Sequence, residues 1–424
     1  MASKIAVIGT GYVGLTTGAC LAHLGHDVVC ADIDQSKVEA LNDGEIPILE
    51  DGLENLIVEA RRAGRLRFVL GAANAVAGRE FVYLCVPTPQ GEDGSADLSY
   101  IEAAATEIGP HLDSEAIVIN KSTVPVGSTR VVEQALQRGD VSVVSNPEFL
   151  REGSAVHDFL NPDRVVIGAV DQGAAIRMAG LYIGMTAPIM VTDPASAETI
   201  KYASNAFLAT KISFVNAVAA VCEAVGADVS DVVLGMGYDK RIGHEFLRPG
   251  PGWGGSCFPK DTVALIHIAE SAGYDFRLLR GVVDVNNEQF ERVVRKVVRE
   301  CGGSVDGKHV AAWGLTFKAR TDDTRQSPAI EVIHRLQDLG AKVTAYDPAI
   351  RSEIEGIPVV GDPVEAVDGA DLLLVLTEWD EFKWIDLEAV GARMAQRRIV
   401  DSRNLLDRSR AQDSGFSYQG IGRR

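Results

Sequence analysis

The fold of the amino-terminal half can be predicted from residues 4–14, which read Lys4-Ile5-Ala6-Val7-Ile8-Gly9-Thr10-Gly11-Tyr12-Val13-Gly14. A short apolar run leads directly into Gly-x-Gly-x-x-Gly, and a helical pattern follows over residues 15–25. A second apolar run, residues 27–31, ends at Asp32. This order predicts a dinucleotide-binding βαβ unit: a strand, a glycine turn, a helix, a second strand and an acidic residue about 20 positions after the turn.

Each residue type in this unit has a separate physical reason. Gly9 permits the tight turn, Gly11 lets a pyrophosphate approach the backbone, and Gly14 allows the helix to pack closely on the strand. Asp32 stands where a carboxylate accepts a hydrogen bond from a ribose 2′-hydroxyl, and it would repel a 2′-phosphate. The pattern therefore favours NAD over NADP, whereas a purely structural glycine turn would not require the acid.

The length and charge of the chain indicate a soluble enzyme of two or three domains. It has 424 residues and a formal net charge of −18, which argues against nucleic acid or a membrane surface as partner. We find no apolar run of the roughly 18 residues that span a bilayer. The first strand begins at residue 4, so we expect no signal or transit peptide.

The six cysteines are scattered and form no Cys-x-x-Cys pair. This pattern is typical of the reducing cytoplasm and predicts neither a zinc site nor a disulfide framework. The positions are Cys20, Cys30, Cys85, Cys222, Cys257 and Cys301.

The order of apolar patterns predicts an α/β fold with two doubly wound parallel sheets and a helical centre. Short strand patterns alternate with helical patterns up to about residue 195, which is typical of a parallel sheet. A long helical run over residues 197–224 follows, and strand patterns resume near residue 308 without a second Gly-x-Gly-x-x-Gly. We therefore predict a NAD-binding Rossmann domain over 1–195, a central helical and dimerisation domain over 196–300, and a second Rossmann-like domain over 301–424.

Residues 249–261 place a thiol at the edge of a glycine-rich loop. This loop reads Pro-Gly-Pro-Gly-Trp-Gly-Gly-Ser-Cys-Phe-Pro-Lys-Asp and puts Lys260 and Asp261 three and four positions after Cys257. Glycines let backbone N–H groups approach a ligand, and a nearby cation or helix N-terminus activates a cysteine as a nucleophile. A buried inert cysteine in a structural loop is the alternative interpretation.

Two further polar groups are ambiguous from spacing alone. Lys201 and Asn205 are four residues apart within the long helical run and share a face, which also fits a solvated helix surface. Lys318 and Arg325 lie in a loop after the first strand of the second α/β unit, where a ligand edge is expected. As bare charges they equally fit surface residues.

Taken together, the motifs resemble the UDP-glucose/GDP-mannose dehydrogenase family along almost the whole chain. The resemblance rests on motifs that occur in the family's order: Gly9 to Gly14, Val86-Pro87-Thr88-Pro89, Lys121-Ser122-Thr123, Asn146 to Glu152, Lys201-x-x-x-Asn205, Arg241-Ile242-Gly243, Gly254 to Asp261, and Phe317-Lys318 through Arg325.

The resemblance implies a four-electron oxidation of a sugar C6 alcohol to a carboxylate, with two NAD and one water. It implies that the Cys257 thiolate retains the aldehyde as a thiohemiacetal, which becomes a thioester and is hydrolysed. Lys201 and Asn205 would stabilise the oxyanion. Thr123 and Asp261 match the pair that holds the hydrolytic water, and Glu152 is the expected general base.

The resemblance also implies the binding residues. Those expected to contact NAD are Gly9, Gly11, Tyr12, Val13, Gly14, Asp32, Lys37, Thr88, Thr123, Glu152, Lys260 and Arg325. Those expected to contact the nucleotide sugar are Glu148, Phe149, Leu150, Lys201, Asn205, Arg241, Phe246, Leu247, Gly254, Phe258, Phe317, Lys318 and Arg403.

Substrate, assembly and reaction class retain alternatives at this point. Family members that act on UDP-N-acetylhexosamines carry Cys-x-Pro-Val-Asp in place of residues 257–261, whereas GDP-mannose enzymes share the present motif. The run 241–247 looks more like the UDP-glucose branch, so we expect UDP-glucose. Arg241 is expected to enter the neighbouring subunit's site, which implies at least a homodimer. A two-electron 3-hydroxyacid dehydrogenase and a non-catalytic nucleotide-sugar sensor are the alternatives from other classes.

Overall fold

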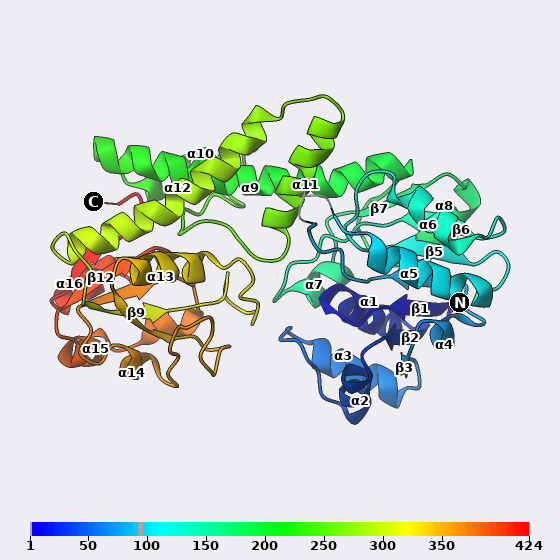
Figure 1. Ribbon diagram of the computed structural model, residues 1–424, viewed down its shortest axis with the longest axis horizontal. Coiled ribbons are helices and arrows are strands. Elements are labelled where there is room, and N and C mark those ends of the chain that lie inside the picture. Colours follow the sequence, from blue (N-terminus) through cyan, green and yellow to red (C-terminus); the bar gives the residue numbers. More distant parts are fainter. Residues whose placement is uncertain (1, 92–95, 424) are drawn as a thin grey trace. The chain divides into compact units, whose positions relative to one another are not determined.

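The computed structural model describes residues 2–91 and 96–423, which form two compact units (Figure 1). The first unit contains the chain up to Ser204 together with Val263–Ala272. The second contains Asn205–Thr262 and the chain from Gly273 onward. The predicted domain boundaries at 195 and 300 stay a prediction.

The first unit is built on an eight-stranded sheet whose strand order is β3-β2-β1-β4-β5-β6-β7-β8. Every neighbouring pair is parallel except β6 and β7, which run antiparallel through Val144 opposite Ala169. The predicted parallel sheet is therefore confirmed except at this one antiparallel pair. The strands are β1 (Lys4–Ile8), β2 (Asp27–Asp32), β3 (Leu66–Leu70), β4 (Phe81–Leu84), β5 (Ile117–Asn120), β6 (Ser142–Ser145), β7 (Val165–Ala169) and β8 (Ile189–Thr192).

Helices cover both faces of this sheet, so the predicted doubly wound arrangement is confirmed. One apolar cluster joins the sheet to α1, α3, α7 and α8, and a second cluster joins it to α4, α5 and α6. The helices are α1 (Tyr12–His23), α2 (Gln35–Asp43), α3 (Leu53–Arg62), α4 (Ala73–Val76), α5 (Ser99–Ile108), α6 (Ser128–Leu136), α7 (Ala155–Leu160) and α8 (Gln172–Ala179), with 3-10 turns η1 (Gly109–His111) and η2 (Gly180–Tyr182).

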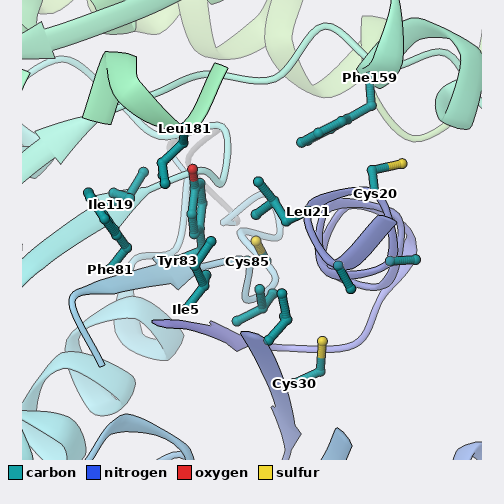
Figure 2. Packing of buried hydrophobic residues seen from close by; sticks show 14 of the residues in the cluster. Ile5, Cys20, Leu21, Cys30, Phe81, Tyr83, Cys85, Ile119, Phe159 and Leu181 are labelled. Carbon is teal, nitrogen blue, oxygen red and sulfur yellow. The ribbon is translucent and has the colours of Figure 1, made fainter. Parts of the chain in front are cut away.

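Three cysteines belong to the core of the first unit. Figure 2 shows Cys20, Cys30 and Cys85 among apolar side chains that include Ile5 and Tyr83. Burial raises the pKa of the Cys20 and Cys85 thiols to about 12, and it raises the pKa of Cys30 as well. These thiols therefore remain protonated at neutral pH and are poor nucleophiles.

Gly14 lies in the first turn of α1, where the helix crosses the end of β1. A Cβ atom at this position would collide with the carbonyl oxygen of Gly9, which is backbone and cannot move aside. We expect Gly14→Ala to lower the free energy of unfolding by about 1–3 kcal/mol, as overpacking does. Urea unfolding tests this, with Gly139→Ala as the control because a Cβ there meets nothing within 4 Å. Equal unfolding midpoints for the two variants would contradict the prediction.

The helical centre of the chain contributes residues to both units. Its longest helix, α9, spans Pro194–Val225 and has 32 residues. By length and composition alone α9 could cross a membrane, which corrects our expectation that no apolar segment reaches that length. A core helix of a soluble protein passes the same test, so this is weak evidence for a membrane. The other helices are α10 (Val229–Gly237), α11 (Phe258–Ser271) and α12 (Arg277–Glu300).

The second unit contains a five-stranded parallel sheet with the order β10-β9-β11-β12-β13. It confirms the predicted second Rossmann-like fold. Its strands are β9 (His309–Trp313), β10 (Lys342–Tyr346), β11 (Leu372–Val375), β12 (Arg398–Asp401) and β13 (Ser417–Gln419). Its helices are α13 (Pro328–Asp338), α14 (Pro363–Ala366), α15 (Leu387–Arg393) and α16 (Arg408–Asp413), with the 3-10 turn η3 (Asp380–Trp384).

Candidate active site

Asp32 lies at the carboxyl end of β2, directly beside the glycine turn. Its Oδ2 accepts hydrogen bonds from the Thr10 backbone N–H at 2.8 Å and from the Thr10 hydroxyl at 2.6 Å. Lys37 Nζ lies 3.6 Å from the same oxygen. Burial would raise the pKa of Asp32, but these hydrogen bonds and the Lys37 charge lower it below its ordinary value. Asp32 is therefore a carboxylate that can accept from a ribose hydroxyl.

The amino-terminal end of α1 fits the pyrophosphate of NAD. Gly11 is the N-cap of α1, and a Cβ built on it would meet nothing within 4 Å, so a ligand can approach its backbone. No acidic residue stands in the first turn and no side chain caps it. The N–H groups of Tyr12 and Val13 at this end suit an anion. The residues predicted from the motif thus form a site whose shape and charge suit NAD.

The turns after β4 and β5 bring two further predicted residues together. The Thr88 hydroxyl donates a hydrogen bond to the Thr123 carbonyl oxygen at 2.9 Å. Both residues stand at carboxyl ends of neighbouring parallel strands, which is the ligand edge of an open α/β sheet.

Glu148 and Lys201 form a buried ion pair within the first unit. Lys201 Nζ lies 2.6 Å from Glu148 Oε1 and also donates to the Glu148 carbonyl at 2.8 Å. The Leu150 N–H donates to the other carboxylate oxygen at 2.6 Å. Burial would raise the pKa of Glu148, but the Lys201 charge and these hydrogen bonds lower it. The loop after β6 therefore presents an ionised, fully paired carboxylate.

The Phe149 ring makes cation–π contacts with Arg164 and Lys201. The Arg164 guanidinium carbon lies 3.6 Å from the ring centroid, and Lys201 Nζ lies 5.6 Å from it. Cation–π contacts of this kind hold an aromatic ring in one orientation. Arg164 was not predicted as a site residue, because a single arginine before a strand carries no distinguishing pattern.

A buried carboxylate ties the glycine turn to the loop that carries Glu148 and Glu152. Glu50 contacts the Tyr12 hydroxyl and accepts from the Gly153 backbone N–H at 2.7 Å. Burial first, and then the Glu50 carboxylate, raise the pKa of Tyr12, with a smaller contribution from the Glu152 charge. Sequence reasoning missed Glu50, because it lies in an irregular segment without a motif.

In the second unit, Cys257 directly precedes α11. The Asp261 N–H donates to the Cys257 carbonyl oxygen at 2.9 Å, as in a first helical turn. The Ser256 hydroxyl lies 3.6 Å from the Cys257 sulfur. Asp261 is 0% exposed, and its carboxylate accepts from the Asn205 amide at 2.6 Å and from Lys260 Nζ at 2.8 Å. The structure thus brings the thiol loop, the amide and the acid together.

The glycine loop before Cys257 is held by three amide side chains from α9 and α12. The Gly250 N–H donates to Asn216 at 2.9 Å, and the Gly250 carbonyl accepts from Gln289 at 2.7 Å. Asn286 pairs with both backbone groups of Trp253, at 2.8 and 2.9 Å. These buried amides were not predicted. Polar residues among apolar ones on a helix face were the only available signal.

The same loop packs against the ligand edge of the second sheet. A Cβ on Gly255 would lie 2.9 Å from the Phe317 ring, and one on Gly250 would lie 3.3 Å from the Arg403 guanidinium. Arg403 donates to the carbonyl oxygens of Leu376 at 2.8 Å and Phe317 at 3.0 Å. These contacts bring the predicted nucleotide residues Phe317 and Arg403 together.

The remaining predicted residues of the second unit lie around this edge or on exposed loops. The Phe246 and Phe258 rings are 6.2 Å apart, and Leu247 is 3% exposed. Lys318 Nζ lies 5.4 Å from the Phe317 ring centroid. Two predicted arginines sit in exposed ion pairs, Arg241 with Asp239 and Arg325 with Asp323. Their roles stay predictions.

Asp347 occupies in the second sheet the place that Asp32 occupies in the first, directly after the second strand of the unit. It is 0% exposed, and its Oδ2 accepts from the Leu315 N–H at 2.7 Å, the Thr316 N–H at 3.1 Å and the Trp379 indole at 3.1 Å. This carboxylate is satisfied internally, so the second sheet does not repeat the ribose site.

Comparisons with known proteins cover the whole chain. Models of the UDP-glucose/GDP-mannose dehydrogenase family match residues 3–186 as its NAD binding domain, 195–288 as its central domain and 311–408 as its UDP binding domain. The chain is 47% identical to "UDP-glucose 6-dehydrogenase TuaD" of Bacillus subtilis, covering 99% of this chain and 93% of the relative. It is 46% identical to a UDP-glucose 6-dehydrogenase of Rhizobium meliloti, covering 99% of each.

A solved structure agrees with these sequence relatives. The UDP-glucose dehydrogenase of Pyrobaculum islandicum superposes with a TM-score of 0.92 at 39% identity, covering 100% of this chain and 98% of that one. The three domain models follow one another along the chain in the order in which the motifs occur. The chain therefore belongs to the UDP-glucose/GDP-mannose dehydrogenase family.

Proposed function

We propose that this chain is a NAD-dependent UDP-glucose 6-dehydrogenase. The reaction converts one UDP-glucose, two NAD and one water into UDP-glucuronate, two NADH and three protons. The observation that carries the proposal is Cys257 at the head of α11, with Asp261 and Asn205 hydrogen-bonded to each other in the same unit. A two-electron alcohol dehydrogenase needs no such thiol. Full-length relatives with this activity support the choice of sugar nucleotide.

Loss of the first hydride from the C6 alcohol gives an aldehyde. The Cys257 thiol retains this aldehyde and converts it into a form that can lose a second hydride. NAD, when bound at the α1 end, supplies the acceptor for both hydrides. The Cys257 thiolate forms a C–S bond to the aldehyde carbon, and the resulting thiohemiacetal loses the second hydride to become a thioester. Water then attacks the thioester, the C–S bond breaks, and the thiolate is regenerated with the carboxylate product. The amino-terminal end of α11 favours the negative charge on sulfur.

The polar residues hold charge and water during these steps. The Lys201 ammonium and the Asn205 amide stabilise the negative oxygen at the reacting carbon. Asp261 and Thr123 hold the hydrolytic water, and Glu152 takes a proton as general base. Asp261 also orients the Asn205 amide through its hydrogen bond at 2.6 Å.

The second unit binds the nucleotide sugar through residues that meet at one sheet edge. Phe317, Lys318 and Arg403 contact the UDP moiety, and the loop from Phe246 to Gly254 with Phe258 encloses the sugar diphosphate. The tight packing of Gly255 on the Phe317 ring supports this assignment.

We further propose that the enzyme is a cytoplasmic homodimer. Along α9, Phe207, Phe214 and Val221 recur every seven residues and are 65%, 53% and 59% exposed. An apolar stripe of this spacing suits burial against a second helix of its own kind. Arg241, whose side chain is 88% exposed, would then enter the neighbouring subunit's sugar site. A reducing cytoplasm keeps the Cys257 thiol available.

The number of NADH molecules formed per sugar tests the activity. Purified enzyme with limiting UDP-glucose and excess NAD is expected to yield two NADH per sugar. One NADH per sugar would support the two-electron alternative, and none would support a sensor. GDP-mannose is assayed in parallel, and a higher kcat/KM for GDP-mannose would overturn the assignment of the sugar nucleotide.

A further inference from the structure

Lys121 is a buried lysine whose hydrogen-bond partner is a neutral amide. It follows β5 directly and is 5% exposed. Its Nζ donates to Asn146 Oδ1 at 3.0 Å and lies 5.9 Å from the Phe159 ring centroid. The Tyr182 hydroxyl donates to the same Asn146 oxygen at 2.8 Å. None of these partners carries a negative charge, so the hydrogen bond does not neutralise the lysine.

The amide that receives Lys121 is fixed in place. The Asn146 Nδ2 donates to the Val166 carbonyl of β7 at 2.7 Å, and its backbone N–H donates to Asn120 at 2.9 Å. Asn146 is 1% exposed. Because both ends of this amide are occupied, its oxygen is directed at the lysine. The ammonium group is thus held at one position between β5 and β6.

The charged neighbours of Lys121 are those of the proposed catalytic machinery. Glu148 stands two residues after Asn146 and is paired with Lys201. Burial lowers the pKa of Lys121 to about 8; the Glu148 charge opposes this, as Cys85 would if it were ionised, and the Lys201 charge adds to it. Cys85 is uncharged at neutral pH, since burial raises its pKa to about 12. Two buried lysines, Lys121 and Lys201, therefore interact electrostatically with one buried carboxylate.

We propose that Lys121 is a positioning residue that places an uncompensated positive charge behind the Glu148–Lys201 pair. This inference rests on the proposed function. Without Lys121 the pair would be neutral, and Glu148 would cancel the charge that Lys201 offers to an oxyanion. With Lys121 the cluster keeps one net positive charge in a medium of low dielectric constant, where it acts strongly on nearby charge. The anionic oxygen formed at the sugar carbon is stabilised by that surplus.

The test compares wild type with Lys121→Met, which preserves length and removes the charge. At pH 7 the kcat/KM for UDP-glucose is expected to be about tenfold lower in the variant. The ratio of wild type to variant should fall toward one as the pH rises through about 8, where Lys121 loses its proton. Other titrating groups, including the Cys257 thiol, affect both proteins and cancel in the ratio.

A matched control is Lys296→Met in the second unit. Lys296 is 7% exposed and paired with Glu223 at 2.7 Å. The control variant therefore also loses a buried ammonium group. Its ratio to wild type is expected to be independent of pH. A pH-independent ratio for Lys121→Met, or a ratio of one at pH 7, would overturn the proposal. Lys121→Gln gives the same readout if the methionine variant does not fold.

A failure of the proposed function can be distinguished from a failure of the Lys121 proposal, because the wild-type enzyme itself would then form no NADH from UDP-glucose. In that case, urea unfolding at different pH values tests whether Lys121 is a buried charge. An unfolded lysine keeps its proton to about pH 10.4, whereas the folded one loses it near pH 8. Between these values the unfolded state binds more protons, so wild type should gain stability relative to Lys121→Met as the pH rises. A constant difference would overturn the inferred buried charge.

Discussion

Replacing Cys257 by serine is expected to lower steady-state NADH formation by about 10³-fold or more, because a serine hydroxyl is not ionised near neutral pH. The aldehyde would not be captured, and the second oxidation would have no thiohemiacetal to act on. Binding of UDP-glucose, measured by calorimetry, should stay within about twofold of wild type, since the sugar nucleotide is held by other groups. In single-turnover assays the variant should form at most one NADH per site.

Cys301→Ala is the matched control for this variant. Cys301 is in the same unit and 7% exposed, and burial raises its pKa. Its removal should leave kcat within about twofold of wild type, because a buried protonated thiol takes no part in the chemistry. Unchanged turnover in Cys257→Ser would contradict the covalent route. Equal losses in both variants would indicate structural damage instead.

Lys201→Met is expected to lower kcat by about 10²- to 10³-fold, the usual cost of losing one oxyanion donor. The same change removes the cation that is hydrogen-bonded to buried Glu148, and removing one partner of a buried ion pair commonly costs about 3–5 kcal/mol of stability. The pKa of Glu148 is low because Lys201 offsets its burial, so the variant's carboxyl should take up a proton at higher pH. Turnover assays and urea unfolding measure the two effects separately.

The double variant Lys201→Met with Glu148→Gln distinguishes stability from catalysis. Removing the carboxylate should recover most of the stability lost in Lys201→Met, since no buried carboxylate is left without its hydrogen-bonded cation. It should not recover kcat, because the ammonium is still missing. If the double variant regained wild-type turnover, Lys201 would serve only to neutralise Glu148, and its proposed role at the oxyanion would be wrong.

The fold was largely predictable because its strands are local patterns. Buried parallel strands such as β1 and β11 appear as short apolar runs, and the glycine turn after β1 fixes the direction of the following helix. Three strands have no clear local pattern in the sequence. In β3 (Leu66–Leu70) Arg67 interrupts the apolar run, β8 (Ile189–Thr192) is an exposed edge strand, and β13 has only three residues. The antiparallel direction of β7 depends on tertiary packing, which no local pattern records.

Site residues could be predicted where they belong to a sequence motif. Their hydrogen-bond and ion-pair partners could not be predicted where those partners are distant in the sequence. Lys201 and Asn205 are four residues apart, yet their side chains meet different acids, Glu148 and Asp261. Spacing alone could not assign those partners. Glu198 was likewise missed. It accepts hydrogen bonds from the Gly127 N–H at 2.7 Å and from the Thr129 hydroxyl at 2.8 Å. In the sequence alone, nothing distinguishes it from an ordinary polar residue of a helix.

The two sheets differ in the use of one carboxylate. Asp32 keeps its side chain 10% exposed beside an open glycine turn, whereas Asp347 is covered and bonded to its own turn and to an indole. Redesign of the second sheet as a dinucleotide site would therefore fail with glycine substitutions alone. The indole of Trp379 would have to be removed and the turn after β9 rebuilt, so that the acid turned outward. Two sheets of the same architecture thus place this acid differently: Asp32 stays partly exposed beside the glycine turn, whereas Asp347 is buried and holds its own loop together.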